Sequence, residues 1–308
     1  MTEEKCQEVL CDRSASGRVR DWKLHKIHNN YIALAYESVD LGKAERMRTC
    51  ADWLKFRREE GGSLKLHDAR FCRVRLCPIC QWRRALKTFA QMSQVLEAAR
   101  QEKYTFLFLT LTMKNVSGSE LSEALDTLSQ GFNRLTKYKA VASVVHGYYR
   151  ACEVTHNTRD DSFHPHLHVI LAVKSTYFKG TSYLSQAEWT KLWARACKFD
   201  YTPIVDVRRC KGGVKAIAEA CKYAVKPSDI INLDDWQMTV DTLAVLDVAL
   251  ASRRFIGLGG VFKDIHKQLH LDDIEDGDLV HVETVETENE VEPEVLTYFW
   301  NGYNQYVR

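Results

Sequence analysis

The 308-residue sequence contains no run of about 18 apolar residues, so it predicts no membrane-spanning helix. Its first residues, MTEEKCQEVLCDRS, are acidic at once and lack an apolar core, which argues against a secretory signal. We therefore expect a cytoplasmic protein with no membrane partner. In that compartment the ten cysteines are expected to be reduced thiols or metal ligands rather than disulfides. The sequence also lacks internal repeats.

The sequence has little net charge, but this charge is unevenly distributed. The total is +2, from 43 basic and 41 acidic residues. Residues 271–294 contain eleven Asp and Glu and no Lys or Arg, so the rest of the chain has 43 basic against 30 acidic residues, or +13. A basic body suits a polyanion, because neutralised phosphates release counterions. An ordinary solvated surface is the alternative, and charge alone does not decide between them.

The order of the expected elements predicts an α+β fold, with an antiparallel sheet flanked by helices. Segments rich in β-forming residues cover 105–112, 147–155, 164–173 and 202–209. Helices are expected from about 81 to 100, after the capping boxes Ser117–Glu120 and Ser185–Glu188, from about 214 to Pro227, and over about 234–252. The order β-α-β-β-α-β-α is close to the split β-α-β of ferredoxin-like folds.

We expect four regions along the chain. Residues 1–100 form an N-terminal region with a Cys-rich zinc-binding element and a helix, and residues 101–230 form the catalytic core. Residues 231–270 are the C-terminal helical part of that core. Residues 271–308 consist of an acidic segment, expected to be a loop or solvated linker, and an aromatic tail that docks back on the body.

The segment FHPHLHVIL places His164, His166 and His168 at every second position of an expected strand. Residues i and i+2 of a strand share a face, so the imidazoles of His166 and His168 point the same way and can chelate one ion. Neutral imidazole suits divalent Mn, Co, Ni and Zn, and carboxylates favour Mg and Mn. Glu153, on the neighbouring hairpin strand, is the candidate third ligand, with His164 as its rival. Polar residues on a half-wet sheet are the alternative.

The segment EACKYAVK places Glu219 and Tyr223 four residues apart, on one face of the expected helix. Lys226 lies on or beside that face, and Lys222 is adjacent to Tyr223. A phenol, with a pKa of about 10, needs a nearby cation and a metal-polarised phosphate before it can attack phosphorus. An exposed helix with a Glu–Lys pair and a packed tyrosine is the alternative.

A Cys-rich block is the third candidate site. Its spacing of Cys72, Cys77 and Cys80, with Cys50 upstream, suits one tetrahedral zinc–thiolate site with a structural role. His67 is a possible substitute ligand, and a set of buried free thiols is the alternative. Several arginines surround the block and are candidates for contacts with DNA phosphates: Arg73, Arg75, Arg83 and Arg84.

The segments FLFLTLT, HPHLHVIL and EACKYAVK, in this order and spacing, resemble the replication initiator (Rep) proteins of Gram-positive rolling-circle plasmids. These proteins belong to the HUH endonuclease superfamily, named for its His-hydrophobic-His motif. The resemblance covers roughly residues 45–265, and FCRVRLCPICQWRR and RRFIGLGGVFK add to it. The first two motifs are generic, whereas EACKYAVK is specific. The resemblance implies an HUH-type ferredoxin-like core over residues 101–230.

The resemblance also implies a site-specific DNA nickase and strand transferase. Tyr223 would attack the origin phosphodiester, keep the 5′-phosphate as phosphotyrosine and free a 3′-OH. His166 and His168 would hold Mn or Mg, and Glu219 would act as general base for a water at termination. Lys222 and Lys226 would lower the pKa of Tyr223 or bind the phosphate. Many HUH enzymes have two tyrosines on this helix; here a glutamate stands one turn before the single tyrosine.

The partners that the resemblance implies are plasmid double-strand origin DNA, single-stranded DNA, a host helicase, a host polymerase and a second copy of the chain in a homodimer. Two alternatives stay open. One is a transposase or relaxase of the same superfamily. The other is a zinc-containing DNA-binding regulator without catalysis, for which the histidine strand and the tyrosine helix would be coincidental.

Overall fold

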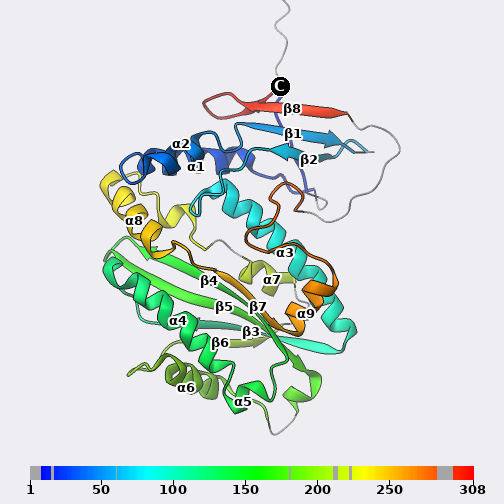
Figure 1. Cartoon of the computed structure of the whole chain (residues 1–308), viewed down its shortest axis with the longest axis vertical. Helices are drawn as coiled ribbons and strands as arrows, with labels where there is room; N and C mark the ends of the chain where they lie inside the picture. The colour runs from blue at the N-terminus through cyan, green and yellow to red at the C-terminus, as the bar shows by residue number, and fades with distance from the viewer. Residues whose placement is uncertain are drawn as a thin grey trace, which may run out of the picture.

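Two antiparallel sheets organise the protein in a computed structural model (Figure 1), which describes residues 8–14, 17–59, 61–179, 182–210, 214–221, 224–282 and 294–308. The strands are β1 (Trp53–Arg58), β2 (Leu64–Ala69), β3 (Tyr104–Thr112), β4 (Gly147–Asn157), β5 (Ser162–Lys174), β6 (Val205–Arg209), β7 (Ile256–Gly260), β8 (Val295–Trp300) and β9 (Tyr306–Val307). The α-helices are α1 (Trp22–Tyr36), α2 (Leu41–Arg48), α3 (Pro78–Gln101), α4 (Leu121–Leu135), α5 (Lys139–Ala142), α6 (Gln186–Cys197), α7 (Val214–Ala220), α8 (Trp236–Ala249) and α9 (Val261–Gln268). Short 3-10 turns are η1 (Gly118–Glu120), η2 (Ser175–Phe178) and η3 (Pro227–Asp229). No helix in these ranges is long and apolar enough to cross a membrane.

The larger sheet has the strand order β6-β3-β5-β4-β7, and all of its neighbouring strands are antiparallel. Because β5 lies between β3 and β4, those two strands run parallel to each other and are joined by a crossover that contains α4. Helix α6 similarly connects β5 to β6. The predicted α+β class, with an antiparallel sheet flanked by helices, is therefore confirmed.

Both faces of this sheet are covered by helices, which explains why its central strands read as continuous apolar runs. Side chains alternate between the faces along each strand. Phe106 and Phe108 point to the face that carries α3, α7 and α9, whereas Leu107, Leu109 and Leu111 point to the face that carries α4, α6 and α8. Figure 1 shows α4 and α6 on one side of the sheet and α3 and α9 on the other.

The helix expected from about 214 to Pro227 is shorter than predicted. Among the described residues, α7 ends at Ala220, and Pro227 begins η3 instead of ending the helix. Lys226 is extended, at φ −77° and ψ 147°, which is the conformation that a following proline favours. The backbone N–H of Val154 donates to the carbonyl of Ala224 (2.8 Å), so this segment runs along β4. Lys226 therefore does not lie on the helix.

The smaller sheet joins the two ends of the chain. Its order is β2-β1-β8-β9, so a strand from the C-terminal tail pairs with β1. The hydroxyl of the buried Tyr306 donates to the carbonyl of Ala51 (2.7 Å). The prediction that the aromatic tail docks back on the body is confirmed. Figure 1 shows this sheet at the top of the view, with α3 running from it towards the larger sheet.

The described part of the acidic segment, residues 271–282, lies along α3; we call it the acidic strap. It contains no regular helix or strand, as predicted, but it is not a solvated linker. Ile274, Leu279 and Val282 are buried. Burial of each such side chain stabilises the folded state by about 1.5–3 kcal/mol. Lys87 on α3 forms an ion pair with Asp272. The strap packs against the body because it combines aliphatic anchors with carboxylates that meet basic side chains.

The strap is expected to resist acid because of one carboxylate. Burial opposes ionisation of Asp273, but the backbone N–H of Asp276 and the guanidinium of Arg254 outweigh it and lower the pKa of Asp273 from 3.8 to about 2. Since the folded pKa lies below the unfolded one, this stabilisation is full above about pH 3.8 and is lost as the pH falls through about 2. In Arg254→Gln we expect the loss to begin at a higher pH. Amide exchange at Asp276 measures it, and equal midpoints in both proteins would contradict the assignment.

Candidate metal centre and active site

Three buried side chains from the central hairpin converge on one point: Glu153 on β4, and His166 and His168 on β5. The strand register pairs Glu153 with His166 directly, and His168 follows on the same face of β5. One ligand atom from each residue lies within 4.8 Å of the others. The Oε2 atom of Glu153 is 3.0 Å from Nε2 of His168 and 3.4 Å from Nε2 of His166. Two imidazoles and a carboxylate are a donor set that suits a divalent transition metal such as Mn.

The far nitrogens of both rings have partners that orient them. Nδ1 of His166 is 3.2 Å from the carbonyl oxygen of His164, and Nδ1 of His168 is 3.5 Å from the hydroxyl of Thr110. A carbonyl only accepts, so Nδ1 of His166 carries a proton and Nε2 is the ring atom that faces Glu153. Nε2 can donate to Glu153 when the ring is charged, and in the neutral ring it offers a lone pair that a divalent ion would bind. Such outer contacts are typical of metal-ligating histidines.

The other oxygen of Glu153 binds a lysine. Nζ of Lys226 is 2.7 Å from Oε1 of Glu153. Burial opposes ionisation of Glu153, but hydrogen bonds from His166, His168 and Lys226 outweigh it and hold the pKa of that carboxyl well below its usual range. Glu153 is therefore an anion with one oxygen held by Lys226 and the other directed at the two imidazoles. Lys226 was predicted to act on the tyrosine; the contact that the structure gives it is with the metal-centre carboxylate.

The structure separates the two candidates for the third ligand. Glu153 belongs to the three-residue group, whereas His164 does not. Nδ1 of His164 instead lies 3.0 Å from the side-chain oxygen of Asn115. Pro165, at the position between His164 and His166, pairs with Val154 across the hairpin. The geometry therefore favours Glu153 as the third ligand.

The predicted nucleophile, Tyr223, and its neighbour Lys222 lie outside the described residues. Glu219 is half-buried on α7. The hydrogen bond to Glu153 raises the pKa of Lys226 despite burial, and the charges of Asp229 and Glu219 add smaller effects in the same direction. The described segments on either side of positions 222 and 223 end at Cys221 and resume at Ala224.

One acidic residue near this centre, Asp229, was not predicted from the sequence. Asp229 lies in η3, three residues after Lys226, and burial raises the pKa of its carboxyl against the charge of Lys226. Its Oδ2 atom is buried without a hydrogen-bond partner in the described structure. The sequence indicates this position only through the segment KPSD, in which Pro227 begins the turn η3 that contains Asp229.

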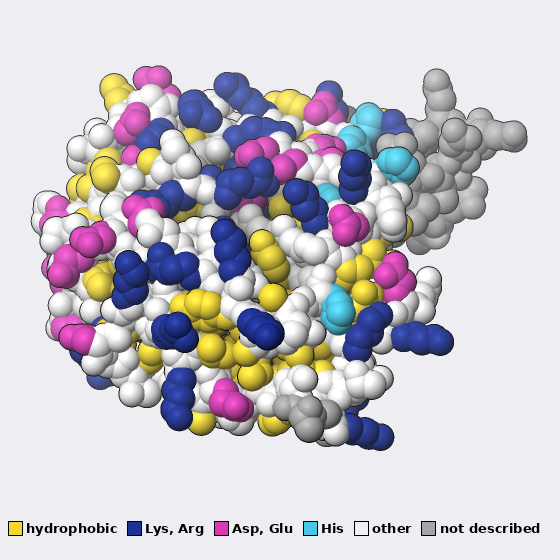
Figure 2. Space-filling model, turned by 60° about the horizontal axis from the view of Figure 1, so that its bottom comes forward, with side chains coloured by type: hydrophobic (Ala, Val, Ile, Leu, Met, Phe, Trp, Pro, Cys, Tyr) yellow, Lys and Arg dark blue, Asp and Glu magenta, His cyan; other side chains and the backbone are white. Residues whose placement is uncertain are grey.

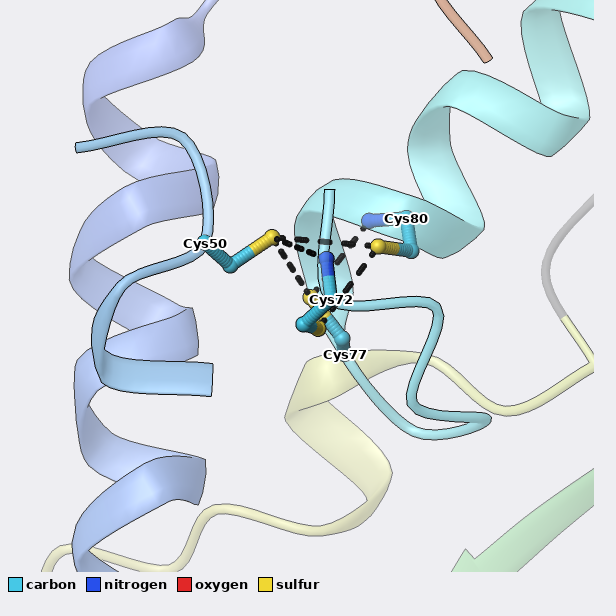
Figure 3. A group of neighbouring side chains, drawn as sticks. All are labelled: Cys50, Cys72, Cys77 and Cys80. Carbon is cyan, nitrogen blue, oxygen red and sulfur yellow. Dashed lines mark hydrogen bonds between the residues drawn. The ribbon is translucent and has the colours of Figure 1, made fainter. Parts of the chain in front are cut away.

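The four predicted cysteines form a second buried cluster (Figure 3), contributed by the loops after α2 and β2 and by the start of α3. The Sγ–Sγ distances are 3.8 Å for Cys50–Cys80 and 3.7 Å for both Cys72–Cys80 and Cys50–Cys77. With Zn–S bonds of about 2.3 Å, a tetrahedron of thiolates has edges of roughly 3.8 Å. The cluster therefore has the dimensions of a zinc–thiolate site.

Backbone N–H groups also point at these sulfurs, as they would at thiolates. The N–H of Cys72 lies 3.4 Å from Sγ of Cys50, and that of Arg73 lies 3.3 Å from Sγ of Cys80. Pro78 opens α3 at its first position, where a missing N–H costs nothing. His67, the possible substitute ligand, lies on β2 and is not part of the group.

The four arginines predicted to contact DNA face the acidic strap or its surroundings instead. Arg73, Arg83 and Arg84 donate to backbone carbonyls of the strap, at Asp276 (2.9 Å), Leu279 (2.9 Å) and Glu275 (3.1 Å) respectively. Arg75 donates to the carbonyl of Arg253 (2.8 Å) and lies 3.8 Å from the Glu275 carboxylate. Their contact with DNA stays a prediction, and the structure gives them a role within the chain.

The chain was compared with known proteins. A family model described as "Replication protein" matches residues 63–307. A "Protein rep" of Bacillus amyloliquefaciens is 43% identical, over 99% of this chain and 98% of the relative. Those of Lactiplantibacillus plantarum and Streptococcus pneumoniae are 42% and 39% identical, over 89% and 98% of this chain and 90% and 96% of the relatives. No solved structure matches. The match over most of its length confirms the resemblance drawn from the motifs, and the chain belongs to the replication protein (Rep) family.

Proposed function

We propose that this protein initiates and terminates rolling-circle replication of a plasmid by nicking and rejoining one strand at the origin. The observation that carries the proposal is the convergence of Glu153, His166 and His168 on one face of the sheet, with Lys226 bound to the Glu153 carboxylate. The strand order, with β5 between two parallel strands, supports the ferredoxin-like arrangement implied for an HUH core.

In the proposed reaction, the phenol oxygen of Tyr223 bonds to the scissile phosphorus while the bond from phosphorus to the 3′ oxygen breaks. The phenol loses its proton and the 3′ oxygen gains one, so a 5′-phosphotyrosine and a free 3′-OH result. Glu153, His166 and His168 would hold a divalent ion, Mn or Mg, whose charge polarises the scissile phosphate. Lys226 holds Glu153 as an anion and adds a positive charge beside the site.

Glu219 is proposed as the general base for the water that attacks when replication terminates. We expect Glu219→Ala to spare the first cleavage, because the attack by the tyrosine does not use Glu219 as a base. Termination should slow by about a hundredfold, because the attacking water loses its general base. Single-turnover cleavage and release of DNA from the adduct measure the two steps. Glu123→Ala, at an exposed glutamate of α4, is the control. Equal loss of both steps in Glu219→Ala would contradict the assignment.

The thiolate cluster is proposed to hold a structural zinc ion, because four protein sulfurs leave no position for a substrate. In Cys80→Ser we expect the zinc content to fall from one ion per chain to near zero and the free energy of unfolding to drop by several kcal/mol. Elemental analysis and thermal unfolding measure these changes. Cys11→Ser, at an exposed cysteine outside the cluster, should keep both values. Full zinc content in Cys80→Ser would contradict the proposal.

The distribution of charge fits a DNA substrate. Figure 2 shows Lys and Arg side chains spread over the face turned forward, around a hydrophobic area in its lower middle part, with Asp and Glu side chains mainly in the left and upper parts. The Lys and Arg side chains offer positive charges that attract the phosphate backbone irrespective of sequence. Origin DNA and single-stranded DNA are therefore the proposed partners, with a host helicase, a host polymerase and a second copy of the chain following from the family.

The test is incubation of the full chain with a single-stranded origin oligonucleotide and Mn or Mg. We expect a covalent protein–DNA adduct that survives denaturing electrophoresis and is absent without divalent ions. Tight, specific DNA binding with no adduct under any of these conditions would instead support the alternative, a zinc-containing regulator without catalysis. Adduct formation that is unaffected by removal of divalent ions would overturn the metal assignment.

A further inference from the structure

A cavity of about 240 Å³ lies on the face of the sheet opposite the metal centre. Its floor is apolar and is lined by Leu125 and Leu128 of α4, Leu167 of β5, and Phe255, of which Leu125 and Phe255 keep a small exposed area and the other two are almost fully buried. Leu167 lies between the two metal-centre histidines in sequence, so it points to the opposite face of β5. Three arginines, Arg150, Arg253 and Arg254, surround this floor; we call the site the arginine pocket.

Two of these arginines are fixed by carboxylates. Arg253 forms a two-pronged ion pair with Asp126, and its guanidinium also donates to the carbonyl of Ala249 (2.8 Å). Arg254 forms an ion pair with Asp273 of the acidic strap, in which its Nη2 atom donates to both carboxylate oxygens, at 2.8 and 3.0 Å. These pairs hold both guanidinium groups in place and neutralise most of their charge.

Arg150 differs from the other two. Its side chain forms no hydrogen bond and no ion pair with any residue that the structure describes. Its guanidinium lies 6.0 Å from the ring centre of Phe132. It pairs across the sheet with Gly257, where an added Cβ would come within 3.1 Å of Nε of Arg150. Gly257 thus leaves room for the arginine to lie flat on β7. Among the described residues, the Arg150 guanidinium is therefore the one positive charge of the pocket that has no carboxylate bound to it.

The chemistry of the pocket points to a ligand with two parts. A guanidinium with free donors binds phosphate oxygens in pairs, which suits it to a phosphate group. The apolar floor suits a flat, weakly polar group such as a nucleobase. With about 30 Å³ for each water molecule in the liquid, the cavity has the volume of roughly eight waters, which admits one base but not a folded peptide.

We propose that the arginine pocket binds one nucleotide, with its phosphate on Arg150 and its base against the leucine floor. A nucleotide of this kind comes from a single-stranded DNA chain or from a free mononucleotide. The first source deepens the proposed function and rests on it, because the DNA strand would then contact both faces of the β4–β5 hairpin. The second is independent of it.

The test measures binding without catalysis. The full-length protein is titrated, without added divalent ions, with a fluorescent twelve-nucleotide thymidine oligonucleotide and separately with a fluorescent thymidine mononucleotide. We expect Arg150→Gln to weaken binding about tenfold and, for the oligonucleotide, to reduce the salt dependence by about 0.7 in log–log slope, as one lost phosphate contact requires. The matched control is Arg195→Gln on α6, where an exposed guanidinium also lies over an aromatic ring, that of Tyr138.

Each outcome decides the proposal. Weaker binding of the oligonucleotide in Arg150→Gln, with or without weaker binding of the mononucleotide, supports the pocket with DNA as the source, and weaker binding of the mononucleotide alone supports it with a free nucleotide. Unchanged binding of both probes, or an equal loss in Arg195→Gln, overturns it. Ser129→Glu, which brings a negative charge to the wall of the pocket without touching the arginine, is the second variant and should give the same loss. Because no cleavage is measured, a protein that binds but does not nick would refute the proposed function and leave this inference standing.

Discussion

Replacing Tyr223 by phenylalanine is expected to abolish the covalent protein–DNA adduct. The substitution removes only the phenol oxygen, so shape and packing change little while the proposed nucleophile disappears. We expect adduct formation to fall by more than about a thousandfold, as for other enzymes that lose their nucleophile. Quantitative denaturing electrophoresis of protein and labelled origin oligonucleotide measures it, and DNA binding should persist.

Tyr303→Phe is the matched control for that experiment. Tyr303 is 85% exposed in the C-terminal tail, far in sequence from the metal centre, and its loss should leave the adduct unchanged. Undiminished adduct in Tyr223→Phe would show that another residue attacks the phosphate. Peptide mapping of the adduct would then identify that residue.

The second large effect is expected at the metal centre. In His168→Ala we expect Mn affinity and cleavage to fall by more than about a hundredfold, because even partners of the ligands cost ten- to a hundredfold when lost. The buried anion of Glu153 also loses its closer imidazole partner, at 3.0 Å. Calorimetric titration with Mn measures metal binding independently of cleavage.

His164→Ala distinguishes the two candidates for the third ligand. Its imidazole faces Asn115 rather than the group of Glu153, His166 and His168, so we expect Mn affinity to change by no more than a few-fold. Glu153→Gln should resemble His168→Ala. The reverse result, with a large loss in His164→Ala and a small one in Glu153→Gln, would assign the third position to His164.

The sheet and the metal centre are largely predictable because both depend on local patterns. Alternation along a strand places His166 and His168 on one face whatever the rest of the fold does. A short polar turn between two strands then brings Glu153 opposite His166, since antiparallel pairing across a hairpin follows from the length of its loop. The spacing of the cysteines likewise contains the information for their cluster, although Cys50 arrives from a separate loop.

The features that sequence analysis did not predict depend on contacts between distant segments. The extension of Lys226 towards Glu153 follows from Pro227, but nothing local says which carboxylate the lysine meets. The acidic strap was predicted to be a linker because its composition is that of a solvated segment. Its three buried aliphatic residues are too few to show the periodicity of a helix or a strand. The four arginines were predicted to contact DNA because their partners within the chain lie about 200 residues away, so no local pattern shows that they are paired.

The pairing of β8 with β1 bears on how the protein is made. β1 needs β8 as its inner neighbour, and Tyr306 reaches the carbonyl of Ala51, the residue after the first cysteine of the thiolate cluster. During synthesis one edge of β1 therefore stays unpaired until residues 294–308 have left the ribosome. A chain interrupted by a late stop codon lacks this strand and presents an unpaired sheet edge, a form that proteases and chaperones select. Completion of the smaller sheet beside the thiolate cluster is thereby tied to the synthesis of residues 295–307.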